Sequence, residues 1–211
     1  MNAYNAIQLN SIEQAIISFT NGLYSSGAID LVTKEEMRDM LSSGQLMSKK
    51  WLLEEFANHL GGELDDLNID QVLVAGGWVG ILARAINDLA DWISVDSLDL
   101  CEKATKVASA TLSDCRGTAI LGDMYDFDYS PYQCVVNTSA EHIPDLPRWI
   151  DLLAPGTVVV VQSNNARHVP DHVNCVDSAD ELKALLGLSE VLYAGELEFP
   201  MYTRYMVIGR K

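Results

Sequence analysis

Apolar residues near the start of the chain recur with the spacing of an α-helix. Ser11 is placed to cap this helix, and Gly27 lies just beyond its expected end. The apolar stripe occupies positions 12, 15, 16, 19 and 23.

Two more helices are expected before residue 62. Thr33 followed three residues later by Glu36 is the pattern of a capping box, so a second helix is expected to start there. A third helix is expected from near Ser48 to Gly61-Gly62. We therefore predict a helical N-terminal extension over residues 1–62. Its apolar stripe fits either a lid or the interface of a homodimer.

After this extension, short β-branched apolar runs alternate with helical patterns. The apolar runs cover 71–76, 92–96, 118–123, 133–138, 157–163, 190–199 and 204–210. The helical segments cover about 79–90, 99–110, 145–153 and 178–186. Strands that alternate with helices predict a parallel sheet covered on both faces. Only "PMY" separates the last two runs, which leaves no room for a helix, so these strands should pair antiparallel.

The expected architecture of residues 63–211 is thus an α/β three-layer sandwich. Its sheet has seven strands, mostly parallel, and the last strand is antiparallel. Arg204 and Tyr202 fall on the terminal hairpin, where we expect them on the surface of an edge strand; the alternative is that they close the substrate side of the site.

The composition of the chain disfavours several classes of function. The 211 residues carry a net charge of −16, which disfavours binding to nucleic acids and to anionic membranes. The N-terminus has neither a basic region nor an apolar core typical of a signal peptide, and no apolar run is long enough to span a bilayer. The four cysteines are widely spaced and contain no CxxC pair, so we expect reduced thiols in a cytoplasmic protein, with Cys134 buried.

A glycine turn, "AGGWVG", follows the first apolar run. Gly76, Gly77 and Gly80 allow positive φ and a close approach of the backbone to a ligand. Neither a GxGxxG fingerprint nor a P-loop is present. Asp96 is expected to end the second strand, where a carboxylate accepts hydrogen bonds from ribose hydroxyls, and Asp123 is expected to end the third.

With these features, residues 69–211 resemble the class I S-adenosylmethionine-dependent methyltransferases, which have a Rossmann-like fold. The resemblance implies that the turn contacts the methionine part of the cofactor, that Asp96 binds its ribose, and that Asp123 and Met124 bind its adenine. It also implies cofactor or substrate contacts from Asn137 and Thr138. The implied cofactor-binding residues are Ala75, Gly76, Gly77, Trp78, Gly80, Asp96, Asp123, Met124, Asn137 and Thr138.

Two positions depart from the family pattern. Val74 stands where the family has an acidic residue, and Trp78 stands at the middle glycine of the turn. Because a Trp adopts positive φ only at a cost, we expect a turn of different shape. Trp78 would then cover the cofactor or shape the substrate pocket.

A second group of polar residues follows the fourth and fifth strands. His142 is a candidate general base for the acceptor, and Glu141 either takes that role or orients His142. The alternative is that both residues only cap the next helix or bond the loop backbone. Further candidates for substrate binding are Lys49, Ser139, Gln162 and Asn164.

We predict no metal site. The chain offers suitable ligand types in Glu141, His142, His168, Asp171 and His172. However, Pro170 lies between the last two histidines and prevents the helical i,i+4 pairing of a compact site.

The sequence therefore predicts a methyltransferase that uses S-adenosylmethionine on a small polar acceptor. One alternative is another reaction of the same cofactor, because Trp78 and the missing acid would re-aim the sulfonium. Another is a non-catalytic binding or scaffold protein with this fold. An NAD-binding domain is disfavoured by the missing GxGxxG and by the terminal hairpin.

Overall fold

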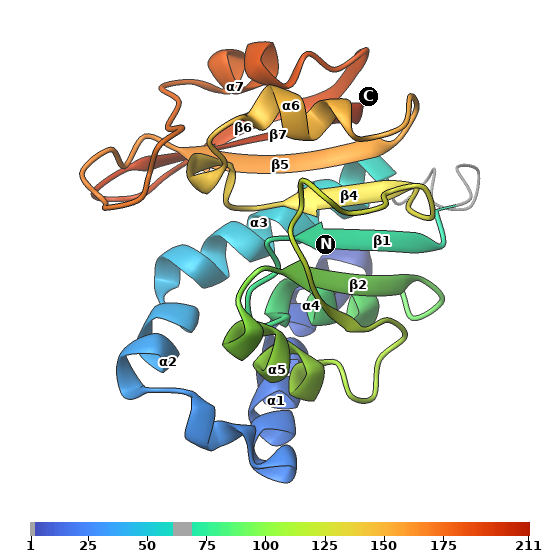
Figure 1. Cartoon of the computed structure of the whole chain (residues 1–211), viewed down its shortest axis with the longest axis vertical. Coiled ribbons are helices and arrows are strands. Elements are labelled where there is room, and N and C mark those ends of the chain that lie inside the picture. The colour runs from blue at the N-terminus through green and yellow to red at the C-terminus, as the bar shows by residue number, and fades with distance from the viewer. Residues whose placement is uncertain (1–2, 61–68) are drawn as a thin grey trace. The chain divides into compact units, whose positions relative to one another are not determined.

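The computed structural model describes residues 3–60 and 69–211 (Figure 1). These residues form two compact units, Met1–Met124 and Tyr125–Lys211. The predicted boundary at residues 62 and 63, like the predicted helix end at Gly61-Gly62, lies outside the described residues.

The first unit consists of a helical segment and a three-stranded parallel sheet. Its strands have the order β3-β2-β1. Its elements are α1 (Ala3–Ser26), η1 (Ala28–Leu31), α2 (Lys34–Met40), α3 (Ser43–Leu60), β1 (Gln71–Ala75), α4 (Ile81–Leu89), β2 (Ser94–Asp99), α5 (Glu102–Thr111) and β3 (Ala119–Leu121).

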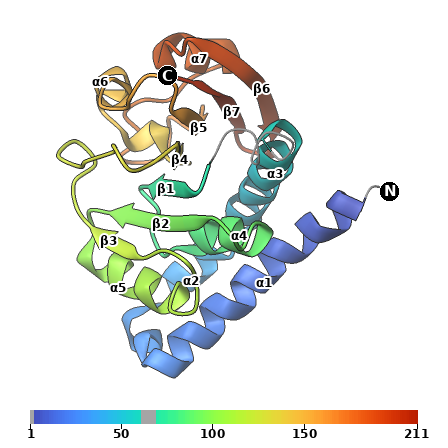
Figure 2. The ribbon, with the colours of Figure 1, turned by 90° about the vertical axis from the view of Figure 1, so that its right-hand side faces the viewer.

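Helix α1 packs along the helices that follow β1 and β2. It contacts α4 and α5 (Figure 2) and buries Phe19 and Leu23 completely. A Cβ at Gly22 would lie 2.2 Å from the carbonyl oxygen of Ala110, so glycine is what allows α1 to approach α5 this closely. The N-terminal helices therefore belong to the same compact unit as the first three strands.

The capping box at Thr33 and Glu36 is confirmed, because each side chain bonds the backbone N–H of the other residue. The third helix begins earlier than predicted, at Ser43 rather than near Ser48. The Ser42 hydroxyl accepts a hydrogen bond from the N–H of Gln45, so it can cap a helix that begins at Ser43.

The second unit is a four-stranded mixed sheet with two helices. Its strands have the order β4-β5-β7-β6, and the valines of β5 are fully buried. Helix α7 packs on β6 and β7 and against α6 (Figure 1). Its elements are β4 (Cys134–Asn137), η2 (Ala140–His142), α6 (Leu146–Asp151), β5 (Val158–Asn164), α7 (Ala179–Leu186), β6 (Glu190–Glu198) and β7 (Thr203–Arg210).

The predicted fold class is confirmed. The seven strands have the order 3-2-1-4-5-7-6, which follows the Rossmann-like pattern. Strand β4 pairs parallel with β5, and β7 pairs antiparallel with both β5 and β6, as the short "PMY" connection requires. Among the described helices, none combines the length and the apolar character needed to cross a membrane.

Candidate functional site

The glycine turn, residues 75–80, connects β1 to α4 in the first unit. Gly76 has φ 69° and Gly80 has φ 79°, values that glycine adopts without strain. Trp78 also has a positive φ, of 51°. The expectation that Trp78 would avoid this region is therefore wrong, and the turn keeps a left-handed residue at the cost of about 1–2 kcal/mol.

Asp99 holds the turn in this conformation. Its Oδ2 accepts a hydrogen bond from the N–H of Trp78 at 2.8 Å, and its Oδ1 accepts one from the N–H of Cys101 at 2.9 Å. The N–H groups of Gly76 and Gly77 both donate to the carbonyl oxygen of Leu98, at 2.9 and 3.0 Å. Three successive N–H groups of the turn thus donate hydrogen bonds to residues at the end of β2.

The prediction that Asp96 ends the second strand is wrong. Strand β2 continues to Asp99, and Asp96 lies within it, opposite Leu73 of β1. The Oδ1 of Asp96 accepts hydrogen bonds from the N–H of Thr118 at 2.6 Å and from its hydroxyl at 3.2 Å. The carboxylate at the C-terminal edge of β2 is therefore that of Asp99.

Gly77 brings the turn close to β2. A Cβ at this position would lie 2.2 Å from the Ser97 hydroxyl oxygen, so no larger residue fits without movement. Asp123 and Met124 follow β3 by two and three residues, near the predicted place; Asp123 is exposed and Met124 half-buried. The turn, Asp99, Asp123 and Met124 all belong to the first unit.

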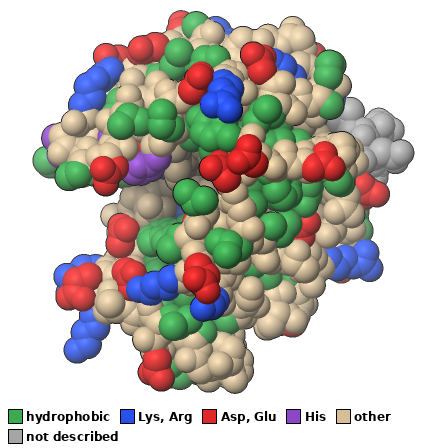
Figure 3. Space-filling view, viewed as in Figure 1, with side chains coloured by type: hydrophobic (Ala, Val, Ile, Leu, Met, Phe, Trp, Pro, Cys, Tyr) green, Lys and Arg blue, Asp and Glu red, His purple; other side chains and the backbone are tan. Residues whose placement is uncertain are grey.

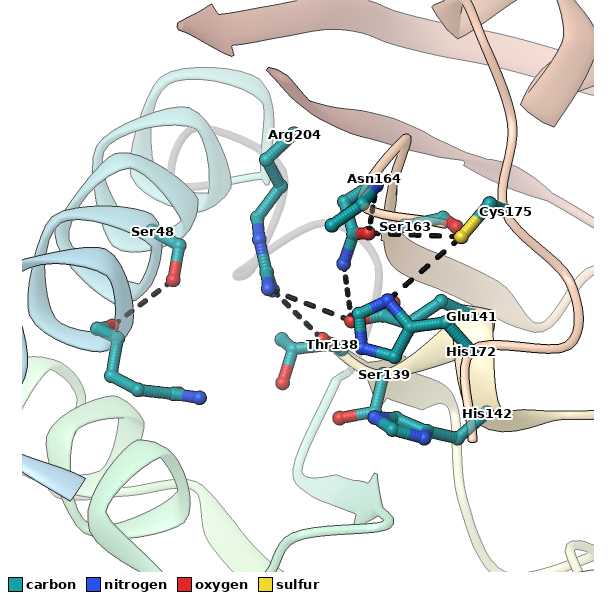
Figure 4. A network of polar contacts seen from close by, with 12 residues as sticks. Ser48, Thr138, Ser139, Glu141, His142, Ser163, Asn164, His172, Cys175 and Arg204 are labelled. Carbon is teal, nitrogen blue, oxygen red and sulfur yellow. Dashed lines mark hydrogen bonds and ion pairs between the residues drawn. The ribbon is translucent and has the colours of Figure 1, made fainter. Parts of the chain in front are cut away.

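A polar cluster formed by Glu141, His142, Asn164, His172 and Arg204 lies in the second unit (Figure 4). Glu141 is only 3% exposed. Its Oε1 accepts a hydrogen bond from Asn164 Nδ2 at 2.6 Å and lies 3.6 Å from Arg204 Nη2. Its Oε2 is buried and has no hydrogen-bond partner among the described residues.

Two histidines complete the polar cluster. The exposed His142 has its Nδ1 3.1 Å from the carbonyl oxygen of Asp171, a residue with φ 69°. The rings of His142 and His172 meet edge to face, with 4.7 Å between their centroids. Burial lowers the pKa of His172 below its ordinary value, and the Glu141 carboxylate opposes this shift.

The residues at and after the end of β4 make hydrogen bonds to their own neighbours and to β7. Asn137 is buried at the end of the strand, and its Oδ1 accepts a hydrogen bond from the N–H of Ser139 at 2.9 Å. The carbonyl oxygen of Thr138 accepts one from Arg204 Nη1 at 3.0 Å. The loop is thereby tied to β7.

Three of the predicted substrate contacts lie within helices and strands and bond to neighbouring side chains. Gln162 does not follow the fifth strand but lies inside β5, fully buried, where its Nε2 donates to Met206 Sδ. Lys49 lies on α3 in the first unit, 8% exposed, and its Nζ bonds Gln45 Oε1. Asn164 also lies within β5, and its amide orients Glu141.

The expected place of Arg204 on the surface of an edge strand is wrong. The strand order places β7 between β5 and β6, so Arg204 is 7% exposed rather than on an edge strand. The terminal hairpin was recognised from the sequence, but nothing in the chain shows which of its strands joins β5.

No protein-family model matches the sequence, and no curated protein matches it. Solved structures do match. The N-methyltransferase NodS from Bradyrhizobium japonicum WM9, in complex with S-adenosyl-l-homocysteine, superposes with a TM-score of 0.63 at 14% identity, over 90% of this chain and 98% of that one. Magnesium protoporphyrin IX methyltransferase (ChlM) from Synechocystis PCC 6803, with bound SAM, gives a TM-score of 0.57 at 16% identity, over 79% and 81%.

The chain has the fold of class I S-adenosylmethionine-dependent methyltransferases. The resemblance seen in the sequence is therefore confirmed for the fold. At these identities the likeness concerns the fold alone.

Proposed function

We propose that the chain binds S-adenosylmethionine and transfers its methyl group to a small polar acceptor. The observation that carries the proposal is the contact between the glycine turn and Asp99 at the C-terminal end of β2. In Rossmann-like sheets, cofactors bind beyond the C-terminal ends of the strands, beside the turn that follows the first of them.

The donors and acceptors of the first unit suit this cofactor better than a dinucleotide. A pyrophosphate needs free N–H groups at the turn, but those of Gly76, Gly77 and Trp78 already donate to β2. S-adenosylmethionine instead presents ribose hydroxyls, an adenine amino group and a sulfonium charge. Carboxylates are the complementary groups, and Asp99 and Asp123 supply them.

Within this proposal Asp99 takes the ribose role that the resemblance gave to Asp96. Each oxygen of Asp99 accepts one backbone hydrogen bond and keeps a lone pair for a hydroxyl. Asp123 and Met124 keep their proposed adenine contacts. The turn residues from Ala75 to Gly80 keep theirs with the methionine part, and the half-buried Trp78 would cover it.

The acceptor chemistry is assigned to the polar cluster of the second unit. Because a carbonyl oxygen only accepts, the contact with Asp171 places the imidazole hydrogen of His142 on Nδ1. Nε2 is then the basic nitrogen, on an exposed ring that a substrate can reach. Methyl transfer needs in-line alignment and removal of the acceptor's proton, and His142 would remove it while Glu141 stays fixed by Asn164 and Arg204.

Calorimetric titration with S-adenosylmethionine and S-adenosylhomocysteine tests the cofactor assignment. Asp99→Asn and Asp96→Asn form a matched pair, since both exchange a carboxylate of β2 for an amide. We expect micromolar binding by the wild type, a loss of about tenfold or more, equal to about 1.4 kcal/mol, in Asp99→Asn, and little change in Asp96→Asn. Failure of the wild type to bind either ligand would refute the proposal.

Product analysis then separates methyl transfer from another reaction of the same cofactor. This alternative is worth testing because Trp78, at φ 51°, places a large side chain in the turn where the family has a glycine. S-adenosylhomocysteine as product supports methyl transfer, whereas methylthioadenosine supports transfer or elimination of another carbon. Binding without turnover on any acceptor would favour a non-catalytic binding protein.

A further inference from the structure

We propose that Glu141, His142 and His172 form a binding site for a divalent first-row transition-metal ion. Each offers one ligand atom, and the three atoms lie within 4.8 Å of one another. Two imidazoles and one carboxylate are a donor set that binds such ions and leaves coordination positions open for water or substrate. Figure 4 shows the three side chains together, beside Asn164 and Arg204.

Glu141 provides the strongest argument. Its Oε1 is engaged by Asn164 and Arg204, while its Oε2 is buried with no hydrogen-bond partner among the described residues. A buried carboxylate oxygen left in this state is costly, because it has lost water without gaining a donor. A cation bound at Oε2 would remove that cost, and the contacts at Oε1 would orient the carboxylate toward it.

His142 has the arrangement of a metal-binding histidine. Such residues usually donate the second ring N–H to a carbonyl or carboxylate, which fixes the tautomer and the ring orientation. Nδ1 of His142 makes this contact with the carbonyl oxygen of Asp171, so Nε2 is the ligand atom. Asp171 presents its carbonyl from a strained backbone with φ 69°.

The backbone brings His172 to the other two ligands. The carbonyl oxygen of Glu141 accepts hydrogen bonds from the N–H groups of Val173 and Asn174, both at 2.9 Å. The Ser163 hydroxyl of β5 donates to the carbonyl oxygen of Asn174. The loop that carries His172 is thereby fastened to η2 and β5. The three ligand side chains therefore come together through the packing of the loop. They do not need the helical i,i+4 pair of histidines, and the lack of that pair was the reason for predicting no metal site.

Binding requires a modest local contraction. Metal–ligand bonds of roughly 2.0–2.2 Å place neighbouring ligand atoms about 3.0–3.5 Å apart. A small shift of the exposed His142 side chain together with the Asp171 carbonyl would close the remaining distance, and its exposure also provides a path of entry. Histidine side chains reach the surface on the face shown in Figure 3.

The donor set also selects the class of ion. Imidazole favours Zn²⁺, Fe²⁺, Co²⁺ and Ni²⁺, whereas Mg²⁺ and Ca²⁺ prefer sites made of oxygen. If the proposed methyl transfer is correct, the ion would lower the pKa of an acceptor hydroxyl bound to it and the released proton would pass to solvent water. His142 would then be a ligand instead of the general base. The site itself does not depend on that function.

The test measures binding of the metal alone to the full-length chain, stripped of metal and without a histidine tag. Co²⁺ binding is followed by its visible d–d absorption, and Zn²⁺ and Mg²⁺ binding by calorimetry. The variants are His142→Ala, His172→Ala and Glu141→Gln. His168→Ala is the matched control, because His168 is exposed in the same loop but lies outside the ligand set. Circular dichroism verifies that each variant is folded.

We expect one equivalent of Co²⁺ or Zn²⁺ to bind the wild type and His168→Ala equally. His142→Ala removes a direct ligand and should weaken metal binding by about 100-fold. This is the upper end of the range found when residues that only orient a ligand are mutated, and a direct ligand should matter at least as much. No saturable binding by the wild type, equal affinity in His142→Ala, or preference for Mg²⁺ would each overturn the site. Because no S-adenosylmethionine is present, this result is independent of the cofactor titration.

Discussion

Two non-glycine residues in the described part of the chain have positive φ, and each lies at a candidate site. Trp78 is in the glycine turn, and the carbonyl of Asp171 holds His142. Strained backbone persists only where its surroundings impose it, and it gathers at functional positions. At Trp78 the imposing contact is the hydrogen bond to Asp99, so the strain and the candidate ribose carboxylate are parts of one arrangement.

The strained backbone at Trp78 predicts that a glycine substitution at this position gives a more stable protein than an alanine substitution. Trp78→Ala and Trp78→Gly both remove the indole, but only glycine accepts φ 51° without steric cost. We expect the glycine variant to be more stable than the alanine variant by about 1 kcal/mol, against the usual advantage of alanine. Urea unfolding of the two proteins measures the difference. An alanine variant of equal or greater stability would contradict the strained backbone.

At the scale of elements, the capping box of α2 extends into an ion pair. Glu36 accepts the N–H of Thr33, and its carboxylate also binds Lys103 of α5, with Nζ–Oε distances of 2.6 and 2.7 Å. Lys103 is the main cause that lowers the pKa of Glu36 from 4.5 to about 2, and the cap adds to it. One carboxylate thus links the start of α2 to α5.

This lowered pKa predicts a pH-dependent contribution to stability. A carboxyl whose pKa falls on folding stabilises the native state above its unfolded pKa, and the contribution disappears as the pH drops through the folded pKa. We therefore expect the difference in unfolding free energy between wild type and Glu36→Gln to be constant above about pH 5. It should shrink between pH 4.5 and about 2. Urea unfolding across this pH range measures it. A difference independent of pH would show that Glu36 is not paired in solution.

Elements were predictable from sequence where one local pattern decides them. The capping box, the glycine turn and the terminal hairpin were found because each depends on residues close together in the chain. The end of β2 was missed because two consecutive polar residues, Asp96 and Ser97, interrupt the apolar run inside the strand, so the carboxylate was placed at Asp96 rather than Asp99. Gln162 and Asn164 were assigned to a site at the edge of the sheet because such polar side chains are rarely buried in a strand, whereas both lie within β5.

At the scale of the whole molecule, what could not be predicted depends on strand order and loop packing. Arg204 becomes buried because β7 lies between β5 and β6. His172 reaches Glu141 because the N–H groups of Val173 and Asn174 donate to the carbonyl oxygen of Glu141, far away in the sequence. No local pattern encodes either contact. The histidines were recognised as possible ligands, but their meeting follows only from the fold.

The rates at which the cysteines react with an alkylating reagent report how well each unit is packed around them. Cys134 of β4 is fully buried, and burial raises the pKa of its thiol to about 12; burial also raises that of Cys115, in the first unit, to about 11. Cys101, at the start of α5, is exposed. Because the thiolate is the reactive form, access and pKa together should set the order of alkylation.

We expect iodoacetamide at pH 8 to label Cys101 first, Cys115 more slowly, and Cys134 only when the second unit unfolds. Peptide mass spectrometry over time, with and without denaturing urea, resolves the three sites. Urea should remove the difference between them, since unfolded thiols have similar pKa values and full access. Rapid labelling of Cys134 without urea would mean that β4 opens readily under native conditions. Asn137, which ends this strand, would then lack the rigid support on which the loop carrying Glu141 and His142 depends.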